Sequence, residues 1–244
     1  MDLKLTGRRA VVTGGSKGIG KAVAAALAAE GCDVGLVARD GDVAEATAAE
    51  LAAASGRRVV ALPADTGDDD AVTAMAARAV VELGGPIDIL VCAAARPNTG
   101  APLRDDDLAT EVNVKVAGYL RCARAFAPGM AESGWGRIIN IAGLAARMSG
   151  TVVGSVRNVA VAAMTKNLAD ELGPAGINVT VVHPGMTRTE RTPPDADGSG
   201  NVIGRMVDAA EVADVVAFLA SPRSVPITGD AIAAGGGVRG PISY

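Results

Sequence analysis

Short apolar runs alternate with longer helical stretches along the chain, and this alternation constrains the fold more than any other feature. The runs at residues 9–13 and 87–93 are rich in Val and Ile, whereas the longer stretches are rich in Ala and carry apolar residues at helical spacing. Strands that alternate with such helices predict right-handed βαβ units and a parallel sheet buried on both faces. We therefore expect an α/β fold over residues 1–244 as one domain: a doubly wound parallel sheet of about seven strands with helices on both faces.

The same alternation places the expected elements and one expected loop. The strands are expected at residues 9–13, 33–38, 59–62, 87–93, 137–141, 177–183 and 230–233. The helices are expected at residues 18–30, 43–55, 69–83, 108–133, 154–172 and 209–219. A polar, Pro-rich stretch follows the sixth strand, where open α/β sheets bind ligands, so we expect residues 189–206 to form a lid over a substrate. A solvated surface loop is the alternative.

Charge and composition argue against several classes of partner. The net charge of −4 gives no reason to expect nucleic acid or an anionic membrane as a partner. No apolar run approaches the ~20 residues of a membrane span, and residues 1–5 lack the apolar core of a signal peptide. Cys32, Cys92 and Cys122 have no metal-type spacing, so we expect buried reduced thiols, no metal site and a cytoplasmic protein.

A glycine-rich loop joins the first expected strand to the first expected helix. It reads Thr-Gly-Gly-Ser-Lys-Gly-Ile-Gly over residues 13–20, and Gly14, Gly18 and Gly20 are its spaced glycines. Glycine lets the chain turn tightly and approach a pyrophosphate, while the helix start adds N–H donors and a partial positive charge. A strand before the loop and a helix after it are the context that this motif requires, so the loop predicts a phosphate-bearing cofactor.

The spacing of this loop, G-x-x-x-G-x-G, resembles the nucleotide loop of the short-chain dehydrogenase/reductase family, and the resemblance runs through the whole chain. Asp65-Thr66 resembles the family's adenine site, Asn113 its helix asparagine, and residues 183–187 its Pro-Gly turn beside the nicotinamide. Residues 92–95, Cys-Ala-Ala-Ala, depart from the usual Asn-Asn-Ala-Gly. The resemblance implies a Rossmann-type fold, an oxidoreductase acting on a small molecule, and a homo-oligomer, either a tetramer or a dimer.

The end of the second expected strand indicates which dinucleotide binds. An acidic residue there would accept hydrogen bonds from the ribose 2′-OH of NAD, but this chain has Arg39, and Lys17 lies in the glycine loop. Two cations suit a 2′-phosphate, so we expect NADP(H) rather than NAD(H). Alternatively, Arg39 is a surface charge and Asp40 only caps the next helix. The expected cofactor-binding residues are Gly14, Ser16, Lys17, Gly18, Ile19, Gly20, Arg39, Asp65, Thr66, Ala93, Ala94, Asn158, Pro184, Gly185 and Thr187.

The residues that perform the family's chemistry are missing. In the family a serine positions the substrate oxygen, a tyrosine donates or accepts the proton, and a lysine lowers the pKa of that tyrosine. Here the serine position reads Ala-Gly at residues 142–143, the tyrosine position is Gly154, and the lysine position is Asn158. No shift of the alignment restores the motif, because the two tyrosines, Tyr119 and Tyr244, have no lysine four residues later.

Four polar residues remain as candidates for catalysis: Asn113, Ser155, Arg157 and Asn158. Arginine can orient a carbonyl but is a poor proton donor, and a serine hydroxyl needs a partner base. Asn158 could bond a ribose hydroxyl in place of the lysine, and Asn113 could equally be structural. His183, the only histidine, is a further candidate base, or else a strand-end residue held by hydrogen bonds.

Three functions stay open. The first is an NADP(H)-dependent oxidoreductase that acts on a small carbonyl or alcohol with a nonstandard proton donor. The second is a cofactor-binding protein without catalysis, either a sensor or the partner of an active relative. The third is a lyase or hydrolase on the same fold.

Overall fold

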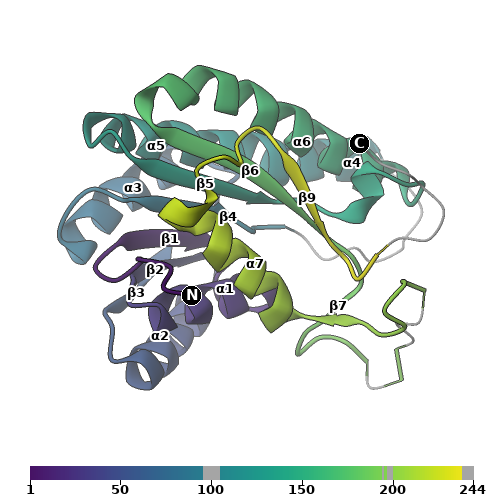
Figure 1. The fold of residues 1–244 in the computed structure, drawn as a ribbon, viewed down its shortest axis with the longest axis horizontal. Coiled ribbons are helices and arrows are strands. Elements are labelled where there is room, and N and C mark those ends of the chain that lie inside the picture. The colour runs from purple at the N-terminus through teal and green to yellow at the C-terminus, as the bar shows by residue number, and fades with distance from the viewer. Residues whose placement is uncertain (96–104, 194, 197–199, 238–244) are drawn as a thin grey trace.

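A parallel sheet runs through the centre of the molecule (Figure 1). The computed structural model describes residues 1–95, 105–193, 195–196 and 200–237. Within these residues seven strands form one sheet in the order β3-β2-β1-β4-β5-β6-β9, and each neighbouring pair is parallel. The strands are β1 Arg9–Thr13, β2 Asp33–Ala38, β3 Val59–Pro63, β4 Ile89–Cys92, β5 Gly136–Ile141, β6 Ile177–Pro184 and β9 Ala231–Ala234. The expected doubly wound α/β class is therefore confirmed.

Helices cover both faces of the sheet (Figure 1). One apolar core packs α1, α2 and α7 on one face, with Leu27 and Val216 among its buried residues, and a second core packs α3, α5 and α6 on the other, with Met75 and Phe126. The α-helices are α1 Gly18–Ala29, α2 Gly41–Ser55, α3 Asp69–Leu83, α4 Asp105–Glu111, α5 Gly118–Glu132, α6 Val152–Leu172 and α7 Ala209–Ala220. Short 3-10 turns lie at Leu144–Ala146, Gly173–Ala175 and Pro222–Ser224.

Local signals account for most helix ends. Helix α3 begins after Asp68, whose carboxylate accepts a hydrogen bond from the Ala71 backbone N–H at 2.8 Å, and ends at Gly84, which adopts φ 77°. A side-chain acceptor before the first turn and a left-handed glycine after the last are common helix boundaries. The prediction for residues 69–83 therefore matches the observed helix.

The expected helix at residues 108–133 differs from the structure. It is divided into α4, a π-helical turn η1 at Val112–Ala117, and α5. A π-turn inserts a residue into the helical repeat and often marks a functional site. The extra residue changes which side chains face the sheet. The apolar pattern of the sequence is continuous here and does not predict the π-turn.

The strand order reverses between β1 and β4, which are neighbours although β2 and β3 lie between them in sequence. In open α/β sheets, ligands bind outside the carboxyl ends of the strands at such a switch point. The glycine-rich loop follows β1 there, so the fold directs attention to this edge. No helix within the described ranges is long and apolar enough to cross a membrane.

Candidate active site

A cavity of about 680 Å³ opens at the carboxyl ends of the strands. The glycine loop and the end of β2 line one side of it, and Lys115, Ala142 and Arg157 line the other. Of the expected cofactor-binding residues, those that line the cavity are Gly14, Ser16, Lys17, Gly18, Ile19, Gly20, Arg39, Asp65, Thr66, Ala93 and Ala94. Asn158, Pro184, Gly185 and Thr187 are not among the described residues that line it.

The glycines of the loop are required by the chain's own packing. Gly14 has φ 66°, and a Cβ atom there would lie 2.8 Å from the Ala93 backbone oxygen. A Cβ atom on Gly20 would overlap the Gly14 backbone oxygen. Side chains at either position would push the loop away from β4 or from helix α1, so the tight strand-to-helix turn depends on both glycines.

An anionic side chain lies at the start of helix α1. The Gly18 backbone N–H donates to both carboxylate oxygens of Glu190, at 3.0 and 3.2 Å. The residue before the helix, Lys17, makes no side-chain capping bond. The Glu190 carboxylate therefore uses the donor that a phosphate would use at a helix N-terminus. The turn fits a dinucleotide pyrophosphate, provided that Glu190 moves aside.

The end of β2 has a cation beside the cavity. Arg39 and Lys17 both line the cavity, while the Asp40 side chain accepts a hydrogen bond from the Val43 N–H at 3.2 Å and caps helix α2. Capping by Asp40 and a cavity role for Arg39 are therefore compatible, although the sequence presented them as alternatives.

The positions of the missing tyrosine and serine are closed by other groups. At the start of α6, the Gly154 N–H donates to the Thr151 hydroxyl at 3.1 Å, and a Cβ atom on Gly154 would lie 2.8 Å from that oxygen. A Cβ atom on Gly143 would lie 2.9 Å from Nδ2 of Asn158. Asn158 is 5% exposed, so its amide fills the space beside Gly143 where a serine side chain would begin.

Of the four candidate catalytic residues, only Arg157 is among the described residues that line the cavity, and Asn113, Ser155 and Asn158 are not. The Asn113 amide donates to the Gly67 backbone oxygen at 3.0 Å and accepts from Arg121 at 2.9 Å, which ties the π-turn to the loop before α3. Ser155 lies in the first turn of α6 and is also absent from the described lining. His183 is buried with its Nδ1 at 2.9 Å from the Gly143 backbone oxygen, and burial lowers its pKa.

Three charged side chains, those of Arg157, Glu111 and Lys115, lie together at this edge, and the sequence did not predict this cluster. Arg157 of α6 forms a short ion pair with Glu111 of α4, and the two side chains are only 12% and 10% exposed. Lys115 of the π-turn is 4% exposed, and its Nζ donates to the Ala142 backbone oxygen at 3.0 Å. Burial and the Arg157 charge lower the pKa of Lys115 to about 7, against the opposing effect of Glu111.

Part of this cluster has a signal in the sequence. Lys115, Tyr119 and Cys122 follow one another at spacings of four and three residues, and all three are buried. A lysine in the buried stripe of a helix is unusual. That spacing could have identified Lys115 from the sequence. No local pattern around Glu111 predicts its ion pair with Arg157 of α6.

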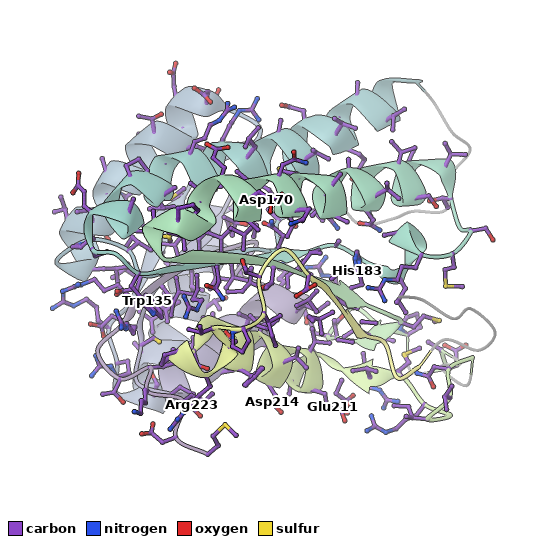
Figure 2. The ribbon with its side chains drawn as sticks, turned by 45° about the horizontal axis from the view of Figure 1, so that its top comes forward. Trp135, Asp170, His183, Glu211, Asp214 and Arg223 are labelled. Atoms are coloured by element: carbon purple, nitrogen blue, oxygen red, sulfur yellow. The ribbon has the colours of Figure 1, made fainter. Side chains whose placement is uncertain are left out.

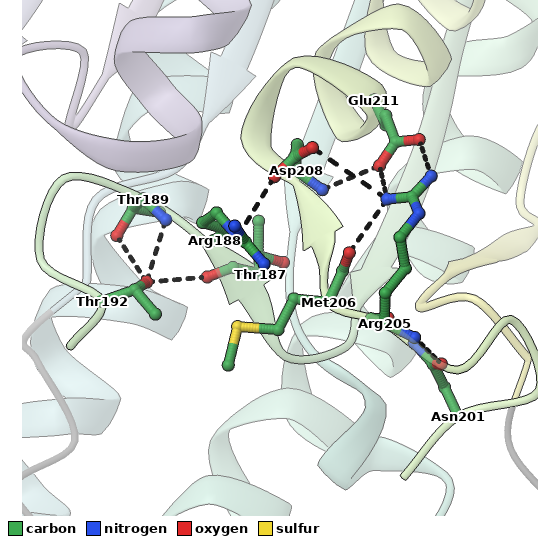
Figure 3. Close-up of polar contacts among 9 residues, drawn as sticks. All are labelled: Thr187, Arg188, Thr189, Thr192, Asn201, Arg205, Met206, Asp208 and Glu211. Carbon is green, nitrogen blue, oxygen red and sulfur yellow. Dashed lines mark hydrogen bonds and ion pairs between the residues drawn. The ribbon is translucent and has the colours of Figure 1, made fainter. Parts of the chain in front are cut away.

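The base of the expected lid is held by a short ribbon and polar contacts (Figure 3). Strands β7 Thr187–Arg188 and β8 Val207–Asp208 pair in parallel. Arg205 binds Glu211 at 2.6 and 2.7 Å, and this contact lowers the pKa of Glu211 to about 2. Thr189 and Arg191 reach the cavity lining. Residues 194 and 197–199 of the expected lid lie outside the described residues, as does Tyr244.

A parallel sheet with a glycine-rich turn and a cavity at its switch point defines a Rossmann-like, doubly wound protein. The chain belongs to the short-chain dehydrogenase family, whose profile matches residues 8–199. The short-chain reductase protein NovJ of Streptomyces niveus is 36% identical to it over an alignment of 244 positions, which spans 93% of this chain and 92% of NovJ.

Solved structures agree with this family. A short chain dehydrogenase from Burkholderia cenocepacia in complex with NADP has a TM-score of 0.87 and 36% identity, with 96% of this chain and 98% of that chain covered. A 3-oxoacyl-acyl-carrier-protein reductase from Brucella melitensis with bound NAD has a TM-score of 0.88 and 28% identity, with 97% and 92% covered. Similar folds in the family therefore carry either dinucleotide.

Proposed function

We propose that this chain is an NADP(H)-dependent oxidoreductase that interconverts a small carbonyl compound and its alcohol without the family's tyrosine. One observation carries the proposal: the same cavity is lined by the glycine loop and Arg39 on one side and by Lys115, Ala142 and Arg157 on the other. A bound dinucleotide supplies or accepts a hydride, and this chain supplies the binding groups and the polar wall beside the substrate.

The cofactor preference rests on charge. Arg39 and Lys17 line the cavity near the end of β2, where they suit the 2′-phosphate of NADP(H). Asp65 and Thr66 would lie against the adenine, and the Gly14–Gly20 turn against the pyrophosphate. The Burkholderia relative bound to NADP supports this preference, and the Brucella relative bound to NAD is the reason to test it.

The remaining roles follow from placement. Arg157 lines the cavity, and a guanidinium group can orient and polarise an oxygen, so we assign it to binding the substrate oxygen. Asn158 supports Gly143 from behind, and Asn113 and Ser155 support the helices. Residues 1–244 would act as one cytoplasmic domain, with residues 189–206 closing over the substrate.

The same proposal includes a homo-oligomer. Val152, Val156 and Val159 lie on α6 at helical spacing and are 57%, 43% and 51% exposed. An exposed apolar stripe of this kind is typical of a surface that packs against another subunit. The mass of the protein in solution distinguishes a dimer from a tetramer.

A second candidate function is a cofactor-binding protein without turnover. The observations that favour it are Gly154 and Asn158 at the two catalytic positions, together with the Glu190 carboxylate at the start of α1. Such a protein would act as a sensor of the nucleotide or as the partner of an active relative.

Two measurements in sequence separate these functions. Calorimetric titration with NADPH and NADH tests binding, and NADPH oxidation with ethyl acetoacetate, benzaldehyde and dihydroxyacetone then tests turnover. NADPH binding with turnover supports the oxidoreductase, and binding without turnover supports the second candidate. Binding of neither nucleotide would contradict both.

A further inference from the structure

Lys115 is a buried amine that faces the cavity. Its residue is 4% exposed, it lines the cavity, and in the described part of the chain its hydrogen bonding consists of one bond, from Nζ to the Ala142 backbone oxygen at 3.0 Å. An ammonium group has three N–H donors. Two N–H donors therefore remain for a ligand in the cavity that Lys115 lines.

The position of this amine relative to the fold is specific. Ala142 immediately follows β5, at the carboxyl edge of the sheet where the cavity joins the glycine loop to Arg157. The π-turn at Val112–Ala117 carries Lys115 to this edge, while Tyr119, one turn further on, donates to the Ile141 backbone oxygen at 3.1 Å. Lys115 of the π-turn and Tyr119 of α5 thus both bind the end of β5, and of these two only Lys115 is among the described residues that line the cavity.

The charged and titratable groups around Lys115 come from four elements. Glu111 of α4 and Arg157 of α6 form a buried ion pair beside it, and His183 of β6 also interacts with it electrostatically. Tyr119 of α5 lies one turn further along the chain. Because Glu111 is bound to Arg157, the pair offers Lys115 little net negative charge, and burial dominates. The pKa of the amine is lowered to about 7, so both of its protonation states are populated near neutral pH.

The other candidates for catalysis are poor proton donors or lie outside the described lining of the cavity. A guanidinium group such as that of Arg157 is a poor proton donor, and an asparagine amide such as that of Asn158 does not act as an acid. His183 is 1% exposed and its Nδ1 lies 2.9 Å from the Gly143 backbone oxygen, and it is not among the described residues that line the cavity. Ser155 is absent from that lining too.

We propose that Lys115 is the catalytic acid and base of this chain, donating the proton to the substrate oxygen when a carbonyl is reduced. The inference rests on the proposed oxidoreductase function. In reduction, the carbonyl carbon gains the hydride that a reduced nicotinamide dinucleotide supplies, and the carbonyl oxygen takes a proton from the Lys115 ammonium. The neutral amine then regains a proton from water. In oxidation, the neutral amine accepts the hydroxyl proton of the alcohol as its carbon loses the hydride.

The test compares wild type with Lys115→Met and Lys115→Arg. The methionine has a similar length without an amine, and the arginine keeps a positive charge but is a poor acid. Lys166→Met is the matched control, since Lys166 lies on the exposed side of α6 and its side chain is 60% exposed. The measurements are NADPH affinity by calorimetry and the pH dependence of kcat for the best of the three carbonyl probes.

The expected result is specific to an acid. For wild type, kcat for reduction falls as the pH rises through about 7, and both Lys115 variants lose about a hundredfold or more in kcat and lose this pH dependence. NADPH affinity changes less than about threefold, which shows that the variants fold and bind. Lys166→Met behaves as wild type.

Three outcomes overturn the inference. If Lys115→Met keeps the wild-type kcat and pH profile, Lys115 is not the proton donor, while the proposed function stands. If Lys115→Arg restores the activity that Lys115→Met loses, the amine contributes only charge. If the wild type binds NADPH but reduces none of the probes, the proposed function itself fails and the inference fails with it.

Discussion

Strand β5 has a buried cation at each end, and the two cations have different surroundings. At its amino end Arg137 is 1% exposed and lies 4.5 Å from the Trp135 ring, and its guanidinium donates to the Gly136 and Ser221 backbone oxygens at 2.7 and 3.3 Å. At its carboxyl end Lys115 has one hydrogen bond within the described residues and a cavity beside it. Figure 2 shows Trp135 and His183 toward the opposite ends of the sheet.

The difference separates a structural cation from a chemical one. Arg137 is packed against the Trp135 ring, and its hydrogen bonds to two backbone oxygens join β5 to the end of α7, while its Nη2 has no partner among the described residues. Lys115 is buried with its hydrogen-bonding capacity largely unused, which costs stability and leaves the amine able to act on a ligand. A buried charge retained beside a cavity is therefore a better indicator of function than burial alone.

The largest expected effect concerns stability and pH at the carboxyl end. The pKa of Lys115 is about 7 in the folded chain and 10.5 in its ordinary state, so the unfolded chain binds the additional proton between these values. The buried Lys115 ammonium therefore lowers the free energy of unfolding by its full amount below pH 7. This destabilisation disappears as the pH rises toward about 10. Relative to Lys115→Met, the free energy of unfolding of wild type should rise by up to about 5 kcal/mol over that range.

Urea unfolding of both proteins across this range measures the difference directly. Because cysteines and other groups titrate in both proteins, their contributions cancel in the comparison. If the difference in free energy of unfolding between the two proteins does not depend on pH, Lys115 is charged throughout this range. That result would remove the contrast between Lys115 and Arg137.

At the amino end, Arg137→Met should destabilise the protein without affecting catalysis. It removes the donors of the Gly136 and Ser221 oxygens and the contact with Trp135, for an expected loss of about 2 to 3 kcal/mol in urea unfolding. The kcat value should stay within about twofold of wild type at a temperature where both are folded. A large loss of kcat at unchanged stability would mean that the two cations are not functionally distinct.

At the cofactor side of the cavity, Arg39→Gln should weaken NADPH binding about tenfold and leave NADH binding unchanged. The loss corresponds to one charge-assisted hydrogen bond to the 2′-phosphate. Calorimetric titration of the variant with both nucleotides measures it. Equal weakening of both, or of neither, would show that Arg39 is a surface charge.

The smallest expected effect concerns the start of helix α1. Glu190→Gln removes a carboxylate from the Gly18 N–H and should tighten NADPH and NADH binding about two- to fivefold, because a helix N-terminus favours a phosphate without a competing anion. Glu132→Gln, an exposed carboxylate at the end of α5, is the control and should leave both affinities unchanged. Weaker binding in Glu190→Gln would mean that the contact orders the loop rather than competes.

The sequence predicted the fold well where local signals and tertiary structure agree. Residues 69–83 form the expected helix because Asp68 and Gly84 mark its two ends, and residues 33–38 form the expected strand because the apolar run at residues 34–38 is bounded by Asp33 and Arg39. The π-turn at Val112–Ala117 was missed, since its residues have an ordinary helical pattern and its extra residue appears only in three dimensions.

The candidate site could be predicted only in part. The glycine loop and Arg39 each lie in one short stretch of sequence, so their roles in binding a dinucleotide can be predicted from the local sequence. Lys115, Glu111 and Arg157 come from three elements and meet only after the sheet and helix α6 have packed. Glu190 reaches Gly18 across 172 positions of sequence, a contact that no local pattern indicates.

One measurement tests most directly whether the Lys115 amine and the glycine loop share a single cavity. Nitrogen NMR of the lysine side chains identifies the Lys115 amine as the resonance absent from Lys115→Met, and NADPH is then titrated into the wild type. The account predicts that this resonance titrates near pH 7 and shifts on binding NADPH, because the amine and the glycine loop share one cavity. A Lys115 resonance that does not respond to saturating NADPH would contradict it.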